Sequence, residues 1–552
     1  MNKYELFPGV FANRGQTEAL DLLFAFLKSD EKAFILCGPG GTGKTTILKK
    51  AIQSYPGKIG GIAVSHKAKK VLGLSIGYDK VMTVASALSI KLNEETGEFK
   101  IDEYNRRDTT KIPIVSMDLI VVDEASMISD EIIKEIKTLK KKSAKVIFLG
   151  DAAQLPPVGS DKISSVFQIK NKYLLTEKMR QAATSPIIKI GEIINNNQKS
   201  ENPVLRALTP EDRVNAYDEL SGSSVLFEND ESAVLDMFVE DFHNSDGDTD
   251  YCKMITYNNE NHNHPQSVKN LNSKIRIKLW GENPNKYYSG EMLTAYDSFY
   301  VSEKIGKLRN GKDMFTSKCL FHNSEDFIVL SVSEPIIKHV HLDHYDRYNH
   351  TRHEHTDEYE VFELTLRNND TDDIIIVPVL TDEGTELCNE NLKYLWNTCK
   401  KLYFDLKKQF ANLQYGYAIS SHKSQGSSYT NTYVFEDNIL GNSNGSPIQG
   451  KNQSLYVAVS RPRKKLVMVS SMNNSIKVIK TNNKVTFKTI SKDELKGSLL
   501  DEEGNRIASH IFDAGTKTKA YIKDMLLYKS NNISGKYVIK VENKQGDFVE
   551  FN

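Results

Sequence analysis

The sequence has no net charge and few cysteines. Lysine and arginine total 72, and aspartate and glutamate also total 72, so the whole chain has no electrostatic preference for polyanions or anionic membranes. The five cysteines are far apart and form no Cys-x-x-Cys pair, which argues against a disulfide framework, a zinc knuckle and an iron–sulfur cluster. We therefore expect reduced thiols, and any nucleic-acid surface has to be local.

Long apolar runs are missing as well. Runs such as Asp118–Val122 (DLIVV) have only the length of a strand, and the first residues, MNKYELFPGV, contain no apolar stretch after a basic start. We therefore expect no membrane span and no secretion signal, and predict a cytoplasmic protein. The 552 residues, 39% hydrophobic and 26% charged, are ordinary for a soluble chain of about three to four domains.

Short apolar runs alternate with helix-like segments in the first part of the chain. The apolar runs are Ala33–Cys37, Gly61–Val64, Leu119–Val122 and Lys145–Leu149. Segments such as Thr45–Tyr55 and Asp130–Lys140 follow them with helical spacing. This alternation is typical of a parallel sheet whose strands are joined by crossover helices.

A second set of apolar runs follows later, at Lys253–Tyr257, Thr432–Glu436 and Leu466–Ser470. A long stretch of different composition lies between the first two of these runs. The sequence therefore predicts an α/β fold with two parallel-sheet domains, the second of which carries an insertion.

The predicted insertion has a β-like part and a helical part. The β-like pieces are Phe327–Val332, Val361–Leu366 and Asp373–Leu380, and Leu387–Leu413 has apolar residues along one helical stripe. This order predicts a small β-barrel followed by helices.

Two further hairpins are predicted. The polar residues 90–113 contain a turn signal at Glu95–Gly97, which predicts a hairpin that protrudes from the first domain. Beyond Ser471 we assign only Lys536–Phe551, which alternates around Asn543–Gly546 like a terminal hairpin.

A phosphate-binding loop follows the first apolar run. Residues 38–45 (GPGGTGKT) satisfy the pattern GxxxxGK[ST] between a strand and a helix, where glycines let backbone N–H groups surround phosphates. Lys44 is expected to reach the β- and γ-phosphates, and the Thr45 hydroxyl to bind Mg²⁺. The expected nucleotide contacts here are Gly38, Pro39, Gly40, Gly41, Thr42, Gly43, Lys44, Thr45 and Thr46.

A pair of carboxylates ends another apolar run. Asp123 and Glu124 follow Leu119–Val122; Asp123 is placed to hold Mg²⁺, and Glu124 to orient or deprotonate the attacking water. A solvated carboxylate pair is the alternative, but its position after a phosphate-binding loop favours catalysis. Together the two elements predict hydrolysis of a nucleoside triphosphate.

Further motifs form an ordered series. GPGGTGKT (38–45), VDEAS (122–126), GDAAQLPPV (150–158), LTEKMRQ (175–181), SHKSQG (421–426) and YVAVSRPR (456–463) follow one another along the chain. In GDAAQLPPV the amide of Gln154 is placed to sense the γ-phosphate. The series resembles the motifs of superfamily 1 helicases, in particular the RecD-like 5′-to-3′ branch (superfamily 1B) and its Dda-type members from bacteriophages.

The resemblance extends over about residues 15–469 and implies a domain organisation. Two RecA-like domains are expected at 1–170 and at 171–290 with 411–471, with ATP between them and single-stranded DNA across their top. An SH3-like β-barrel with helices is expected at 291–410, and an extension of unknown role at 472–552. If the source is a bacteriophage, the expected location is the host cytoplasm.

The resemblance also implies further nucleotide contacts. Gln16 matches the residue that reads adenine, and Gly426 belongs to a motif at the nucleotide. Arg180 and Arg461 match arginines that approach the γ-phosphate from the second domain. A charge supplied across the cleft acts only when the cleft is closed, and so couples hydrolysis to domain motion.

DNA contacts are implied on both domains. They are Ser65, His66 and Thr83 on the first, Ser420, His422 and Lys423 on the second, and Phe99 or Tyr104 at the tip of the strand-separating hairpin. An alternative for the hairpin is a loop whose aromatic residues pack on their own domain. The chain departs from the family pattern at Thr83-Val84-Ala85, which lacks a base-facing histidine, and at Tyr257, where threonine is usual.

Six of the 13 histidines lie within His339–His355. Alternating histidines on a strand could form a transition-metal site. The run lacks the spacing of a known zinc site, and we favour a polar loop of the inserted domain, partly disordered.

The sequence thus predicts an ATP- and Mg²⁺-dependent DNA helicase that moves 5′ to 3′. Expected substrates are single-stranded DNA and forked duplex DNA, expected partners are proteins of replication, recombination or repair, and the expected state is a monomer. An RNA helicase and a nucleotide-gated clamp that does not unwind are the alternatives. A neutral chain fits, because translocation needs contacts that release easily.

Overall fold

The computed structural model describes most of the chain. The described residues are 4–93, 98–101, 108–157, 160, 162–177, 184–259, 264–282, 284–307, 313–346, 350–441 and 448–474, followed by the strands at 484–489, 494–500, 506–513, 519–522, 525–531, 537–542 and 548–551. Among these residues, no helix combines the length and the apolar character that crossing a bilayer requires.

The first α/β unit is built on a six-stranded sheet in which every neighbouring pair of strands is parallel. Its order is β10 (Lys172–Leu174), β3 (Ala33–Cys37), β9 (Lys145–Gly150), β8 (Leu119–Val122), β4 (Ile59–Ala63) and β5 (Val81–Thr83). All residues of β8 and β9 are buried, as expected for central parallel strands covered on both faces. The predicted parallel sheet is confirmed.

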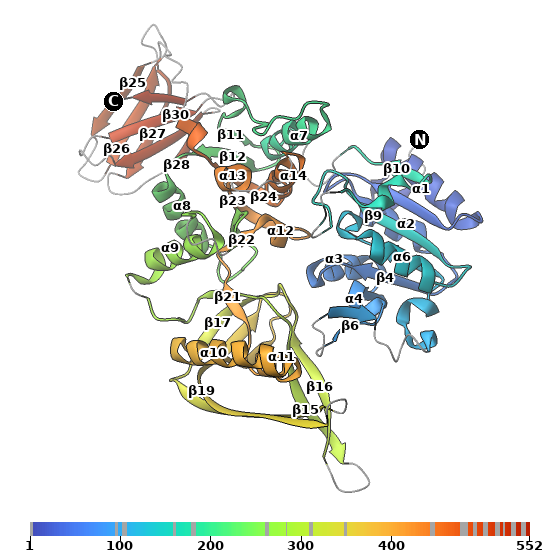
Figure 1. Ribbon diagram of the computed structural model, residues 1–552. Helices are drawn as coiled ribbons and strands as arrows, with labels where there is room; N and C mark the ends of the chain where they lie inside the picture. Colours follow the sequence, from blue (N-terminus) through green and yellow to red (C-terminus); the bar gives the residue numbers. More distant parts are fainter. Residues whose placement is uncertain are drawn as a thin grey trace.

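Helices cover both faces of this sheet (Figure 1). The helices α1 (Arg14–Lys28), α2 (Lys44–Ile52) and α3 (His66–Ile76) pack into one apolar core, and α6 (Asp130–Leu139) packs into the other. Asn13 and Gln16 form a capping box that begins α1, and Ser129 caps α6. Each of these helices begins at the carboxyl end of a strand or after a capped turn, so their N-termini gather where the motifs lie.

The second α/β unit has its own six-stranded sheet. Its order is β11 (Ala216–Asp218), β12 (Ser223–Glu228), β24 (Pro462–Val469), β23 (Tyr429–Phe435), β13 (Cys252–Thr256) and β22 (Ala418–Ser420). Only β11 is antiparallel to its neighbour. Helices α7 (Pro186–Lys199), α8 (Glu231–His243), α9 (Val268–Trp280) and α14 (Ile448–Val459) pack on it. Because β13 lies beside β22 and β23, the residues between them form an insertion, as predicted.

The insertion is a third unit, which we call the inserted β unit. Its sheet has the order β18 (Ile336–Asp346), β19 (Thr351–Asn368), β17 (Asp326–Val332), β14 (Met292–Ala295) and β21 (Leu413–Tyr415), with β20 (Ile374–Leu380) also paired to β19. A long hairpin, β15 (Phe299–Lys307) with β16 (Asp313–Phe321), leaves this sheet. Its likeness to an SH3 domain stays a prediction.

Two predictions for the inserted β unit are wrong. The helical stretch Leu387–Leu413 is two helices, α10 (Asp382–Thr398) and α11 (Lys400–Lys407), followed by β21; Cys399 lies between them in an extended conformation. The histidine run is mostly strand and not a loop: His339, His341 and His344 lie in β18, and His353 and His355 lie in β19, which pairs with β18 along the whole length of β18, while His350 is in a turn and residues 347–349 lie outside the described residues. Among the described residues no group of three or more histidine, cysteine, aspartate or glutamate side chains could hold a metal ion.

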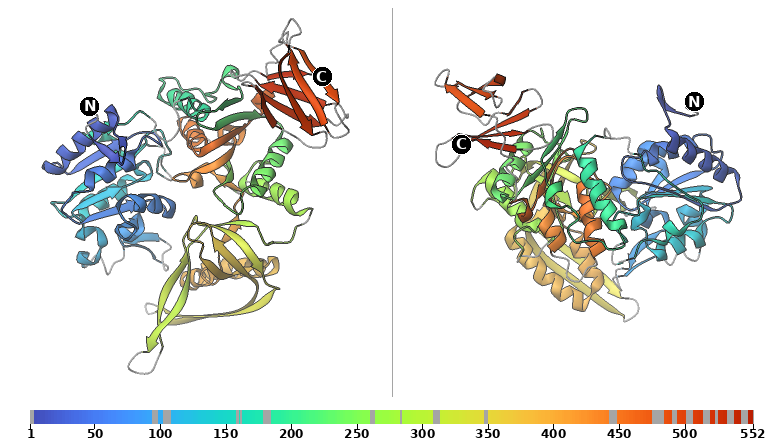
Figure 2. Two further views of the ribbon diagram at one scale, coloured as in Figure 1. Left: turned by 180° about the vertical axis from the view of Figure 1, so that it is seen from behind. Right: turned by 90° about the horizontal axis from the view of Figure 1, so that it is seen from above.

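The paired strands of both remaining predicted hairpins are described by the structure. In the first unit, β6 (Ile90–Asn93) pairs with β7 (Glu98–Ile101), while residues 94–97 and 102–107 lie outside the described residues. Near the C-terminus, β30 (Tyr537–Glu542) pairs with β31 (Phe548–Phe551), as the terminal alternation predicted. The C-terminal strands lie on the side of the second α/β unit that faces away from the first (Figure 2).

Candidate functional site

The loop after β3 has a conformation that only glycine accommodates. Gly38 has φ 153° and Gly43 has φ 86°. A Cβ on Gly38 would lie 2.6 Å from the backbone oxygen of Leu175, and one on Gly43 would lie 2.8 Å from Nε2 of Gln16. The loop therefore curls tightly before α2, and its backbone N–H groups are available for an anion at the start of this helix.

Lys44 and Thr42 hold this loop in shape. The Nζ of Lys44 donates to the backbone oxygens of Gly38, at 2.6 Å, and Pro39, at 3.0 Å. The hydroxyl of Thr42, a buried residue, also donates to Pro39 O, at 3.0 Å. Gly40 is exposed, and Gly41, Thr45 and Thr46 are half-buried beside it. The ammonium group thus lies inside the loop, where phosphates would displace its carbonyl partners.

Asp123 and Glu124 lie at the carboxyl end of β8, beside this loop. The backbone N–H of Asp123 donates to Ile62 O, and its carboxylate accepts from the Glu124 N–H, both at 2.9 Å. Glu124 has φ +50°, a left-handed conformation that is strained for this residue type. Burial, with the nearby charge of Asp123, raises the pKa of Glu124 to about 7. A carboxyl with such a pKa can exchange protons near neutral pH.

A cavity of about 340 Å³ adjoins the phosphate-binding loop. It is lined by Asn13, Arg14, Gly15, Glu18, Tyr173, Leu174, Leu175, Thr176 and Glu177. Gln16 itself is buried; its Nε2 donates to Thr42 O at 3.3 Å, and its Oε1 accepts from the Asn13 N–H at 3.1 Å. The structure thus places Gln16 against the loop, while its neighbours line the cavity.

Side chains of the two α/β units contact one another directly, next to Glu124. Nε2 of Gln425 donates to Oε1 of Gln154 at 3.1 Å and to Oγ of Ser126 at 3.4 Å. The hydroxyl of Tyr456 donates to Oδ2 of Asp151 at 3.1 Å. These bonds join GDAAQLPPV to SHKSQG and YVAVSRPR. The sequence analysis assigned no role to Gln425, Tyr456 or Asp151, although all three lie inside motifs that it quoted.

Gly426 and Arg461 lie at the same contact, on the side of the second α/β unit. A Cβ on Gly426 would lie 3.8 Å from Oγ of Ser65 and 3.9 Å from Oε1 of Glu124. The buried guanidinium of Arg461 donates to Val457 O, Ser427 O and Ser460 Oγ. Its charge also acts against the upward shift in the pKa of Glu124, which places the two groups near each other. Arg180 lies outside the described residues.

Three of the predicted DNA contacts share a structural position. Ser65 caps α3, Thr83 caps the short helix α4 (Val84–Ala87), and Ser420 caps α12 (Ser421–Ser424). Each hydroxyl oxygen accepts from a backbone N–H three residues later. Each also stands at or just after the carboxyl end of a parallel strand, β4, β5 or β22. The hydroxyls are therefore gathered at the strand ends, where ligands of open α/β sheets bind.

Two other predicted DNA contacts, His66 and Lys423, contact the inserted β unit. The His66 ring stacks on that of His322, with centroids 3.6 Å apart. Lys423 donates to Ala295 O at 3.2 Å and lies over the ring of Tyr296, and burial lowers its pKa to about 7. His322 and Tyr296 belong to the inserted β unit, and no motif marked them.

One departure from the family pattern and one of the two predicted wedge residues can also be located. Tyr257, which stands where threonine is usual, packs edge-on against His422 with centroids 5.5 Å apart. Phe99 lies in β7, and Tyr104 lies outside the described residues.

Comparisons with known proteins agree with this geometry. A family model described as an AAA domain matches residues 12–219. The chain is 25% identical over 522 residues to an uncharacterized protein of Acanthamoeba polyphaga mimivirus, covering 83% of this chain and 99% of that protein. It is also 25% identical over 473 residues to the ATP-dependent DNA helicase dda of Enterobacteria phage T4, covering 81% of this chain and 97% of that protein.

Shorter and more distant similarities were also found. The ATP-dependent RecD2 DNA helicase of Deinococcus radiodurans is 29% identical over 177 residues, which cover 31% of this chain and 22% of that protein. Among solved structures, a Pif1 helicase from Bacteroides in complex with ADP-AlF3 and single-stranded DNA is 17% identical, with a TM-score of 0.42, over 84% of this chain and 93% of that chain.

Proposed function

We propose, since this chain is a superfamily 1B helicase related to Dda, that it is an ATP-dependent DNA helicase that moves 5′ to 3′ along single-stranded DNA and separates duplex DNA. The observation that carries the proposal is the contact between the two α/β units beside Glu124, where Gln154 and Gln425 are hydrogen-bonded at 3.1 Å. A hydrolysis site that spans two units can convert nucleotide turnover into relative motion.

ATP would bind on the first α/β unit. The loop Gly38–Thr45 would surround its phosphates, with Lys44 as the cation, and its base would lie near the cavity beside Gln16. Thr45 and Asp123 would hold Mg²⁺, because a hydroxyl and a carboxylate oxygen are ligands that this ion accepts. The ion would neutralise phosphate charge. Glu124 would orient the attacking water and accept its proton.

The second α/β unit would complete the site. Arg461 is close enough to Glu124 for their charges to interact, and Gly426 faces the same carboxylate. Arg180 is proposed as a second arginine on the strength of its motif alone. A guanidinium beside the γ-phosphate stabilises charge in the transition state, so hydrolysis would require the closed cleft.

DNA would lie across the carboxyl ends of the strands, on Ser65, Thr83 and Ser420. These hydroxyls and the adjacent helix N-termini suit phosphate groups. His66, His422 and Lys423 lie beside them, next to the inserted β unit. The proposed substrates are single-stranded DNA and forked duplex DNA, and the hairpin β6–β7 is proposed as the strand separator.

One experiment tests the reaction, its activator and its direction. ATP hydrolysis is measured with no nucleic acid, with single-stranded DNA and with RNA of matched sequence, beside unwinding of 5′-tailed and 3′-tailed duplexes. We expect stimulation by DNA and product only from the 5′-tailed duplex. Stronger stimulation by RNA would indicate an RNA helicase, and stimulation without unwinding of either duplex would indicate a nucleotide-gated clamp.

Arg461→Ala should lower ATP turnover by about 100-fold or more, because its charge is needed at the closed cleft. Binding of single-stranded DNA without nucleotide should stay within about twofold of wild type, since the guanidinium bonds within its own unit. Arg463→Ala, at the exposed start of β24, is the matched control. An equal loss of DNA binding and turnover in Arg461→Ala would contradict the assignment.

Phe99→Ala and Tyr104→Ala test the hairpin. A stacked base contributes roughly 1–3 kcal/mol, and a wedge acts only where duplex meets single strand. The variant of the wedge residue should keep DNA-stimulated hydrolysis and lose unwinding of a 5′-tailed duplex, most strongly where G·C pairs are frequent. Wild-type unwinding of such duplexes by both variants would move the strand separator to another part of the chain.

A further inference from the structure

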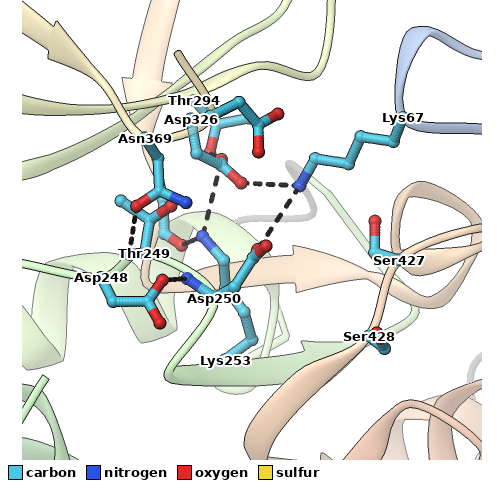
Figure 3. A network of polar contacts seen from close by, with 12 residues as sticks. Lys67, Asp248, Thr249, Asp250, Lys253, Thr294, Asp326, Asn369, Ser427 and Ser428 are labelled. Carbon is cyan, nitrogen blue, oxygen red and sulfur yellow. Dashed lines mark hydrogen bonds and ion pairs between the residues drawn. The ribbon is translucent and has the colours of Figure 1, made fainter. Parts of the chain in front are cut away.

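Four charged side chains meet where the inserted β unit touches both α/β units (Figure 3). Lys67 comes from α3 of the first unit, Asp250 and Lys253 from the second, and Asp326 from the start of β17. Nζ of Lys67 lies 2.7 Å from Oδ2 of Asp326 and 3.9 Å from Oδ1 of Asp250. Nζ of Lys253 lies 3.6 Å from Oδ1 of Asp326. The carboxylate of Asp326 is thus paired with both Lys67 and Lys253.

The side chains of the cluster are buried to different degrees. The side chains of Lys253 and Asp326 are 0% and 4% exposed, whereas that of Lys67 is 18% exposed. Charges at such depth are costly unless they are paired and hydrogen-bonded. Burial alone would raise the pKa of Asp326, but Lys253 and Lys67 hold it far below its usual range. The carboxylate is therefore ionised and strongly bound.

Asp326 keeps most of its partners without Lys67. The hydroxyl of Thr294, on the neighbouring strand β14, donates to its Oδ1, and Lys253 remains beside the same oxygen. Lys253 is held in turn by Gly416 O at 2.5 Å and by the sulfur of Met292 at 3.1 Å. All these groups belong to the second α/β unit and the inserted β unit. These groups, here called the socket, hold Asp326 through contacts that do not involve Lys67.

Lys67 is the one member of the four that belongs to the first α/β unit. If the units separate, Lys67 returns to water, where an ammonium is well solvated, and Asp326 keeps Lys253 and Thr294. Separation therefore leaves Asp326 paired inside the protein, and Asp250, which loses Lys67, has a side chain that is 32% exposed and can be solvated, so the contact can open and close reversibly. Removing Asp326 is different, because Lys253 would then stay buried beside Lys67 without their shared carboxylate.

Lys67 lies next to residues that are proposed to bind DNA. Ser65 caps α3, and His66 stacks on His322 of the inserted β unit. The second ion pair between these units, Lys70 with Asp370, lies one turn further along α3 and is more exposed. Lys67 therefore fixes the inserted β unit over the end of α3 where the proposed DNA phosphates bind.

We infer that Lys67 is a positioning residue, which enters a preformed socket of Asp326, Lys253 and Thr294 and so holds the inserted β unit over the DNA-binding end of α3. The effect on DNA binding rests on the proposed function, whereas the contact between Lys67 and Asp326 is independent of it. Opening of the socket moves the inserted β unit away from Ser65, and closing brings it back toward the bound strand.

Hydrogen exchange tests the contact without reference to activity. In Lys67→Met, backbone amides at the start of α3 and in β17 should exchange about tenfold faster than in wild type, since both surfaces lose a shared charged hydrogen bond. Lys70→Met is the matched control, because exposed ion pairs contribute little; its exchange should stay within about twofold. Equal exchange in the two variants would overturn the inference.

Hydrolysis kinetics test the positioning role. For Lys67→Met, the concentration of single-stranded DNA that gives half-maximal stimulation should rise about tenfold, while turnover at saturating DNA stays within about twofold. Lys67→Arg should recover at least half of the loss. Faster exchange with an unchanged DNA requirement would overturn this role. A wild-type protein without DNA-stimulated hydrolysis would refute the proposed function, and the exchange comparison would still decide on the contact.

Asp326→Asn completes the test through stability. It should lower the melting temperature by more than Lys67→Met does, because it leaves the charge of Lys253 buried without a carboxylate partner. Equal or smaller destabilisation by Asp326→Asn would show that no preformed socket exists.

Discussion

Lys44→Ala should abolish ATP hydrolysis, with turnover at least about 100- to 1,000-fold below wild type, the usual effect of removing one pre-placed group that stabilises transition-state charge. Lys44 is the only cation in the segment GPGGTGKT. Its Nζ already lies inside the loop, on Gly38 O and Pro39 O, so it needs little rearrangement to meet phosphates. No neighbour in this loop can replace its charge.

The measurement is phosphate release at saturating ATP, with and without single-stranded DNA. Lys49→Ala is the matched control, because Lys49 lies on the same helix and is exposed; its turnover should stay within about twofold of wild type. Retention of single-stranded DNA binding by Lys44→Ala would show that the fold is intact. Turnover within about tenfold of wild type would contradict the phosphate-binding role of Lys44.

The α/β core could be predicted from the sequence because its strands are short, apolar and bounded by turn residues. Ala33–Cys37 and Leu119–Val122 are strands with the predicted bounds, and the phosphate-binding loop lies between β3 and α2 as its motif requires. In these segments local propensity and tertiary burial favour the same structure.

The inserted β unit was harder to predict because its polar composition favours a loop, whereas its backbone forms paired strands. His339–His355 is polar, yet backbone pairing of β18 with β19 makes it a strand pair, and only Val340 of β18 is buried. With a single buried residue, β18 lacks the alternation of apolar and polar residues that identifies a half-buried strand. Similarly, the break at Cys399 depends on packing that apolar periodicity does not reveal.

The residues that carry the chemistry of the site could be predicted from the sequence, but the contacts between distant residues could not. The motifs gave the phosphate-binding loop and the carboxylates. They did not give the partners that lie far away in the sequence: Gln425 for Gln154, 271 residues apart, and Asp326 for Lys67, 259 residues apart. Such pairs arise from the way the three units are arranged, which one sequence does not encode locally.

Glu124→Gln should stop hydrolysis while leaving ATP bound, because the phosphate and metal groups Lys44, Thr45 and Asp123 remain. Glutamine keeps the size of glutamate but cannot accept a proton from water. The positive φ of Glu124 directs this side chain from the end of β8 toward Gly426. Strain of about 1–3 kcal/mol is tolerated where the surrounding structure holds it, which is consistent with a position that function requires.

The dependence on pH gives the sharpest test of this role. The pKa of Glu124 is raised to about 7, so the carboxyl is mostly protonated below that pH and mostly ionised above it. A base works in its ionised form, so wild-type turnover should rise with pH through about 7 and then level off, by at least about tenfold between pH 5.5 and 8.

Glu124→Gln should turn over ATP at least about 100-fold more slowly and should show no such rise. Asp151→Asn, which alters a nearby carboxylate bonded to Tyr456, should keep the rise and serves as the matched control. Nucleotide affinity of Glu124→Gln is measured with a fluorescent ATP analogue and should stay within about threefold of wild type. Wild-type turnover in Glu124→Gln, or an unchanged pH profile, would assign the proton acceptor to another group.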